Sequence, residues 1–110
     1  MRPKMSDLDF TIGCKVTFFS KKRRTSPNLN NGKYCPHLVI KGSEQLLGVN
    51  FIDGEDVTFD KQIGANALPE NEAVDYSILQ KGTEFLIMEG GNVVGEGIVK
   101  EIFQHKPYGS

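Results

Sequence analysis

Residues 85–99, FLIMEGGNVVGEGIV, constrain the fold of this chain more than any other part of its sequence. Two runs of apolar, strand-forming residues flank the tetrapeptide Glu89-Gly90-Gly91-Asn92, which consists of turn formers. This order predicts a β-hairpin with a tight turn. The stretch contains four glycines, Gly90, Gly91, Gly95 and Gly97. We expect them to serve the backbone, either by adopting a positive φ in the turn or by allowing close approach of a neighbouring strand.

The remaining sequence also shows strand patterns. Residues 10–20 alternate between apolar and polar positions, which indicates a half-buried strand. Its expected buried face consists of Phe10, Ile12, Cys14, Val16 and Phe18. Residues 21–36 are rich in turn formers and predict a long loop. Further short strands are predicted at residues 37–41, 46–52, 55–60 and 73–79. Residues 64–66, Gly-Ala-Asn, are interpreted as a turn, and no window has apolar residues at helical spacing.

The predicted fold class is all-β. The chain has 110 residues, of which 38% are hydrophobic and 25% charged, and this fits one globular domain. Short strands at regular spacing suggest a sandwich or a barrel, and closure into a barrel removes unpaired strand edges. We expect the domain to span residues 9–104, with a flexible N-terminus at residues 1–8 and a flexible tail at residues 105–110.

Within residues 85–99 the chain matches the family pattern F-x-I-R-E-G-G-R-T-V-G-x-G-x-V without a gap. The matched residues are Phe85, Ile87, Glu89, Gly90, Gly91, Val94, Gly95, Gly97 and Val99. The stretch resembles the last hairpin of the C-terminal, third domain of elongation factor Tu. The resemblance implies a small closed antiparallel β-barrel, here as a stand-alone domain.

The resemblance extends over about residues 10–103. The long loop matches the family segments G-R-H-T-P and G-Y-R-P-Q at Arg24, Pro27, Tyr34 and Pro36. In elongation factor Tu this barrel helps to hold the T-stem backbone of aminoacyl-tRNA and is not itself catalytic. The resemblance therefore implies RNA-facing positions at His37, where the family usually has Gln, and at Glu89 and Gly90.

Three basic positions of the family are missing from this chain. The family's arginines are replaced here by Cys35, Met88 and Asn92. Because protein–RNA affinity depends on Lys and Arg that neutralise phosphates, these replacements weaken the case for tRNA binding. A protein partner is therefore expected first, and a tRNA-like partner stays an alternative.

Two functional hypotheses follow from the resemblance. The first is a non-enzymatic binding module, related to translation, that binds a protein or tRNA-like partner. The alternative is a mimic, antagonist or immunity-type protein that occupies a factor recognising elongation factor Tu. A small enzyme on the same barrel is a third class, but the sequence has no recognisable motif that pairs a nucleophile with a base.

The strongest electrostatic feature is the run Lys21, Lys22, Arg23 and Arg24. The complete set of candidate binding residues adds Tyr34, His37, Glu89 and Gly90. Four adjacent cations can form a solvated loop, contact an acidic protein surface or pair with RNA phosphates. Residues 1–41 carry nine Lys or Arg and two acidic residues, a net +7, and the rest carries −8. The overall charge of −1 argues against strong non-specific attraction to nucleic acid.

Several other kinds of site are not expected. His37 and His105 lie far apart, and only Cys35 lies at ligand spacing from His37, so no metal or cofactor is expected. The glycine turn lacks the Lys-Ser/Thr of a phosphate loop, which argues against a nucleotide. No signal peptide and no apolar run of about 20 residues is present, so a cytoplasmic protein without membrane association is expected. Cys14 and Cys35 are expected to be reduced and at least partly buried, with a single disulfide as the alternative.

Overall fold

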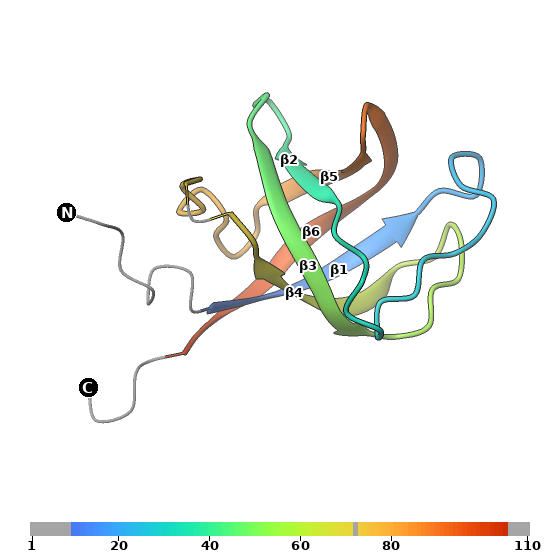
Figure 1. The fold of residues 1–110 in the computed structure, drawn as a ribbon, viewed down its shortest axis with the longest axis horizontal. Coiled ribbons are helices and arrows are strands. Elements are labelled where there is room, and N and C mark those ends of the chain that lie inside the picture. Colours follow the sequence, from blue (N-terminus) through green and yellow to red (C-terminus); the bar gives the residue numbers. More distant parts are fainter. Residues whose placement is uncertain (1–9, 72, 106–110) are drawn as a thin grey trace.

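The chain forms a closed antiparallel β-barrel, seen in a computed structural model that describes residues 10–71 and 73–105 (Figure 1). Its strands are β1 (Phe10–Phe18), β2 (His37–Ile40), β3 (Leu46–Gly54), β4 (Ile63–Pro69), β5 (Glu84–Glu89) and β6 (Asn92–Gln104). They follow one another around the barrel in the order β1-β4-β3-β2-β5-β6, and pairing of β6 with β1 closes it. The described residues contain no helix. The predicted all-β barrel is therefore confirmed.

The strand directions place three connections at one end of the barrel. Because each neighbouring pair is antiparallel, β1, β3 and β5 run in one direction and β2, β4 and β6 in the other. The connections after the odd-numbered strands are residues 19–36, 55–62 and 90–91. We call these three segments the loop end, which lies at the right of Figure 1. The opposite end of the barrel carries the connections at residues 41–45 and 70–83, the start of β1 and the end of β6.

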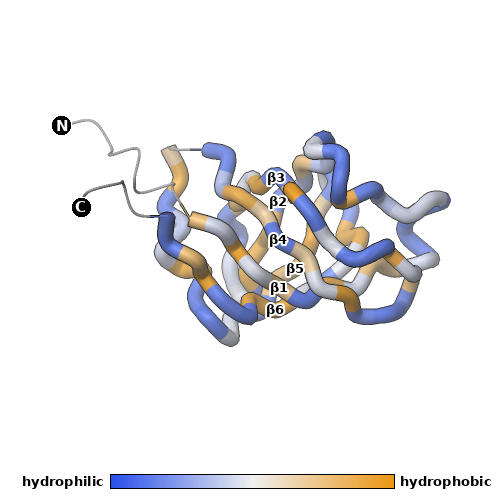
Figure 2. The backbone as a smooth tube through the Cα atoms, turned by 90° about the horizontal axis from the view of Figure 1, so that it is seen from below, coloured by the Kyte–Doolittle hydropathy of each residue, from blue (hydrophilic) through white to orange (hydrophobic). Residues whose placement is uncertain are grey.

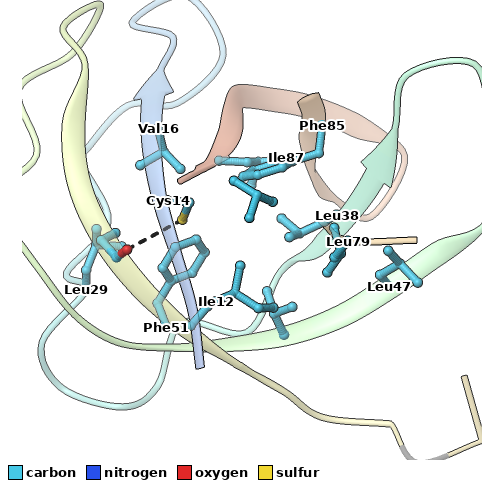
Figure 3. Close-up of a cluster of buried hydrophobic side chains, with 14 of the residues drawn as sticks. Ile12, Cys14, Val16, Leu29, Leu38, Leu47, Phe51, Leu79, Phe85 and Ile87 are labelled. Carbon is cyan, nitrogen blue, oxygen red and sulfur yellow. Dashed lines mark hydrogen bonds between the residues drawn. The ribbon is translucent and has the colours of Figure 1, made fainter. Parts of the chain in front are cut away.

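The barrel interior is filled by alternate residues of the strands. In β1 the predicted inward face, from Phe10 to Phe18, is buried as expected. Side chains of β1, β3 and β5, among them Ile12, Phe51, Phe85 and Ile87, point toward one another in the interior (Figure 3). Hydrophobic and hydrophilic positions alternate along the strands (Figure 2), which matches the two-residue period of a sheet with one buried face.

The glycine-rich hairpin forms as predicted. Glu89 pairs with Asn92 across the two-residue turn, and Gly90 has a φ of 61°, the positive value that type II′ hairpin turns require at their first central position. In β6, a Cβ on Gly95 would lie 2.5 Å from the Thr17 carbonyl oxygen, and one on Gly97 would lie 2.6 Å from Phe85 Cζ. Both expected glycine roles are therefore confirmed, positive φ at Gly90 and close strand approach at Gly95 and Gly97. Gly91 has neither role, since it is not among the residues with positive φ and its Cβ would meet nothing within 4 Å.

Three predicted elements are wrong. Residues 64–66 belong to β4 rather than to a turn, because this segment pairs with β1 on one side and with β3 on the other. Residues 55–60 form a loop whose Val57 and Phe59 pack against the core without strand pairing. Residues 73–79 form turns, because the hydroxyl of buried Tyr76 holds the segment by donating to the Gly48 carbonyl at 2.5 Å. Most of the apolar residues in these two segments are buried or partly buried, although Ile78 is exposed, but neither segment forms a strand.

The predicted flexible segments lie mostly outside the described residues. Residues 1–8 and 106–110 are not described. His105 is the described part of the predicted tail, and its Nε2 forms a hydrogen bond of 2.6 Å with Thr11 Oγ1. β6 itself extends to Gln104.

Both cysteines are free thiols, but they differ in burial. Cys14 is buried, whereas Cys35 is exposed, so the expectation of partial burial is wrong for Cys35. Cys35 lies in the connection before β2, where the side chain is turned away from the core. Burial raises the pKa of the Cys14 thiol from 9.0 to about 12. The neutral thiol therefore stabilises the fold below pH 9, and this contribution is lost as the pH rises toward 12.

We expect a thiol reagent to distinguish the two cysteines. At pH 8 the reagent should modify one thiol per native chain and both thiols in denaturant, because the Cys14 thiolate is scarce and shielded. Absorbance of the released chromophore measures this stoichiometry. A Cys35→Ser variant should show no native modification. Rapid modification of two thiols in the native wild type would contradict the burial of Cys14.

Candidate functional site

An ion pair joins two segments of the loop end that are distant in sequence. The Arg23 Nε donates to Glu89 Oε2 at 2.6 Å, and the Tyr34 hydroxyl donates to the same oxygen at 2.5 Å. Arg23 also donates through Nη1 to the Thr25 carbonyl. We call these residues the Arg23–Tyr34–Glu89 cluster. It fastens the 19–36 connection to the hairpin turn, although 66 positions separate Arg23 from Glu89.

Tyr34 connects this cluster to the core. Its ring stacks on Phe51 with centroids 5.7 Å apart and meets Phe18 edge-on at 5.9 Å. The Arg23 guanidinium carbon lies 5.5 Å from the centroid of the same ring, within the range of a cation–π contact. Burial raises the pKa of the Tyr34 phenol, and the hydrogen bond to Glu89 raises it further. The hydroxyl therefore stays protonated and continues to donate to Glu89.

The basic run lies in a turn with its own hydrogen bonds. The Ser20 hydroxyl donates to Asp60 Oδ2 at 2.6 Å, and the Ser20 amide donates to Oδ1 at 3.1 Å. These bonds lower the pKa of the Asp60 carboxyl. The Lys22 amide donates to the Phe19 carbonyl at 3.1 Å, and the Phe19 amide donates to the Val94 carbonyl at 2.9 Å. The turn is thus attached both to the 55–62 connection and to β6.

The four cations of this turn fall into two kinds. Lys21, Lys22 and Arg24 are exposed. The Arg23 side chain is only 21% exposed, because it lies between the Glu89 carboxylate and the Tyr34 ring. Arg23 is therefore a structural cation, and the other three are the ones a partner can contact.

The structure brings all the predicted candidate residues to the loop end. His37 begins β2, is exposed and pairs with Met88, the neighbour of Glu89. Gly90 is exposed in the hairpin turn. Glu89, which the resemblance assigns to RNA, is instead engaged by Arg23 and Tyr34, with 32% of its side chain exposed.

Sequence reasoning missed the residues that support the basic turn. Ser20 and Asp60 are 40 positions apart, and Asp60 holds a φ of 64°, rare for a residue other than glycine. Phe51, which lies under Tyr34, was assigned only to a strand. Asp60 falls at the end of the segment predicted as a strand, residues 55–60. Asp is a residue type that bonds to the backbone in turns, but this does not identify Ser20 as its partner.

A shallow groove of about 490 Å³ crosses the outer face of β6, β1, β4 and β3. Its lining contains both acidic and basic side chains, and several of its polar groups bond to one another. Asn66 Nδ2 donates to Asp53 Oδ1 at 2.7 Å, and the Gly64 amide donates to Glu55 Oε1 at 3.0 Å. These bonds favour a structural role for the polar groups of the groove.

Within residues 10–71 and 73–105, no group of three or more His, Cys, Asp or Glu side chains is placed to hold a metal ion. No helix of that part of the chain is long and apolar enough to cross a membrane. Comparisons of the sequence with protein-family models and with curated proteins found no match.

We expect Glu89→Gln to lower the free energy of unfolding by about 1 kcal/mol, since it leaves the partly buried Arg23 without its counter-charge. Glu84→Gln is the matched control, because the Glu84 carboxylate pairs with Lys41 while 59% exposed. The control should change stability by at most about 0.5 kcal/mol. Urea unfolding followed by circular dichroism measures both. Equal changes in the free energy of unfolding would show that the Arg23–Tyr34–Glu89 cluster stabilises the fold no more than an exposed ion pair does.

Proposed function

We propose that this chain is a non-enzymatic binding module that engages a macromolecular partner through its loop end. The observation that carries the proposal is the Arg23–Tyr34–Glu89 cluster, which joins the basic turn and the glycine turn into one surface. A surface whose segments are already ordered loses less conformational entropy on binding. The exposed cations Lys21, Lys22 and Arg24 would supply its electrostatic attraction.

The resemblance to the third domain of elongation factor Tu supports a partner related to translation, and hence a cytoplasmic location. The residues that carry the resemblance, in segments 24–36 and 85–99, include two members of the Arg23–Tyr34–Glu89 cluster. His37 and Gly90 would lie at the edge of the contact surface, because both are exposed at the loop end. The partner would therefore meet segments that are distant in sequence.

Affinity capture from a lysate of the source organism tests this proposal. One variant carries Lys21→Ala, Lys22→Ala and Arg24→Ala and keeps Arg23, so that the supporting ion pair is preserved. The control carries Lys15→Ala, Lys81→Ala and Lys100→Ala, which removes the same charge from outside the loop end. Quantitative mass spectrometry should show partners that the control retains and the loop-end variant loses by about tenfold. Recovery of identical material by all three proteins would refute the proposal.

The mimic or antagonist hypothesis is the second candidate. It is favoured by the engagement of Glu89 within the chain and by the absence of cations at Cys35, Met88 and Asn92. Such a chain would keep the shape of the barrel without its RNA contacts. If this hypothesis holds, added elongation factor Tu should compete with the chain for the captured partner. Capture that is insensitive to an excess of the factor would argue against mimicry.

A further inference from the structure

We infer that the partner of the loop end is a protein that presents an acidic segment, whose carboxylates pair with Lys21, Lys22 and Arg24. The inference rests on the proposed function and adds the chemical class of the partner. An RNA backbone is the competing class, since phosphates also attract Lys and Arg. Three properties of the loop end favour carboxylates on a protein.

The first property is the small number of exposed cations at the loop end. Lys21, Lys22 and Arg24 lie within one turn, Lys33 and Lys61 are exposed elsewhere at the loop end, and Arg23 is already paired with Glu89. A protein that depends on phosphate contacts can neutralise about 6–10 phosphates along a nucleic-acid backbone. The three cations grouped in one turn instead fit a short acidic segment.

The second property is the presence of acidic residues at the same end. The 55–62 connection contains Glu55, Asp56 and Asp60 beside the single cation Lys61, a net charge of −2, and Asp60 is bonded directly to Ser20 next to the basic turn. A continuous phosphate backbone extending past the basic turn would meet these carboxylates. A protein segment can place its carboxylates opposite the cations and uncharged residues opposite the 55–62 connection, and it thereby avoids this repulsion.

The third property is the lack of a free aromatic face in the Arg23–Tyr34–Glu89 cluster. Single-stranded RNA is commonly held by bases that stack on exposed aromatic rings. The Tyr34 ring is instead occupied by Phe51, Phe18 and the Arg23 guanidinium. The cluster is thus used to order the loop and is not available as a stacking platform.

The adjoining hairpin turn can accommodate a protein backbone. Gly90 and Gly91 are exposed, and open space surrounds the positions that their Cβ atoms would occupy. A partner chain can therefore approach this turn closely while its carboxylates reach the cations. The Ser20–Asp60 bonds keep the turn that carries the cations in place, which favours binding over a freely moving basic loop.

Fluorescence anisotropy with defined probes tests the inference. The probes are a fluorescein-labelled octapeptide of alternating Glu and Asp, a labelled single-stranded RNA of matched charge, and bulk tRNA. The loop-end variant carries Lys21→Glu, Lys22→Glu and Arg24→Glu, and the control carries Lys15→Glu, Lys81→Glu and Lys100→Glu. Thermal unfolding of each protein confirms that it is folded before binding is measured.

The acidic peptide should bind the wild type and the control alike, and it should bind the loop-end variant at least about tenfold more weakly. RNA binding should not depend on the loop-end cations. The inference is overturned if the peptide binds all three proteins equally or none of them, or if the loop-end substitutions abolish RNA binding instead. Nuclease treatment in the lysate experiment keeps the two proposals separate. Loss of a loop-dependent partner on nuclease treatment would refute the partner class but leave the proposed function standing.

Discussion

Gly97→Ala should lower the free energy of unfolding by about 3 kcal/mol, a cost at the upper end for an added methyl group in a packed interior. The new Cβ would lie 2.6 Å from Phe85 Cζ and 2.7 Å from the Lys15 carbonyl oxygen. Phe85 is fully buried and Lys15 contributes a backbone atom of β1, so neither neighbour can move away cheaply. The strain falls where β6 pairs with both β1 and β5, and it therefore opposes closure of the barrel.

Gly91→Ala is the matched control for this result. No atom lies within 4 Å of the Cβ that it would add, and Gly91 is not among the residues with positive φ. Its free energy of unfolding should stay within about 0.5 kcal/mol of the wild type. Both variants are measured by urea unfolding with circular dichroism. A Gly97→Ala protein as stable as Gly91→Ala would mean that β6 does not pack as closely on β5 and β1 as described.

Leu29→Ala should also cost about 3 kcal/mol, because it leaves a cavity beneath the long connection. Leu29 lies within the 19–36 segment and is only 1% exposed, so it anchors that segment in the core. Its Cδ1 would lie 2.8 Å from a Cβ on Gly54, which explains the glycine at that position. Beside it, Asn30 accepts a hydrogen bond from the Gly54 amide at 3.2 Å and donates to the Gly54 carbonyl at 3.0 Å.

Leu46→Ala is the control for Leu29→Ala, since the Leu46 side chain is 50% exposed. It should change stability by at most about 0.5 kcal/mol. Amide hydrogen exchange of the two variants adds a local measurement. Leu29→Ala should speed exchange in the 19–36 connection more than elsewhere, because that connection loses its core anchor. If Leu29→Ala matched Leu46→Ala in both measurements, burial of Leu29 would not be what holds the long connection on the core.

Periodicity predicted the strands whose pattern depends on neighbours close in sequence. Apolar and polar residue types alternate over the whole length of β1, and the hairpin of β5 and β6 has both its strands and its turn within residues 84–104. The roles of Gly90, Gly95 and Gly97 followed from glycine's lack of a Cβ. These features can be predicted from residues close together in the sequence or from the general packing of strands.

The segments that were predicted wrongly depend on distant neighbours. β4 has the inward residues Ile63, Ala65 and Ala67, and its small residues resemble a turn until β1 and β3 lie on either side. Conversely, residues 73–79 have the apolar pattern of a strand but form turns. The Tyr76 hydroxyl donates to the Gly48 carbonyl, and the segment pairs with no strand. Tertiary contacts override local preference in both cases.

The sequence by itself determined a glycine-rich hairpin, an all-β fold class and a basic loop, because the side-chain period, glycine geometry and the order of charges are properties of the local chain. The residue pattern left a sandwich and a barrel open, and the pairing of β6 with β1 decides for the closed barrel. Only the tertiary structure decided that Arg23 is structural, whereas Lys21, Lys22 and Arg24 face solvent. The physical reason is that Glu89, the counter-charge of Arg23, lies 66 positions away and reaches it only after the barrel has closed.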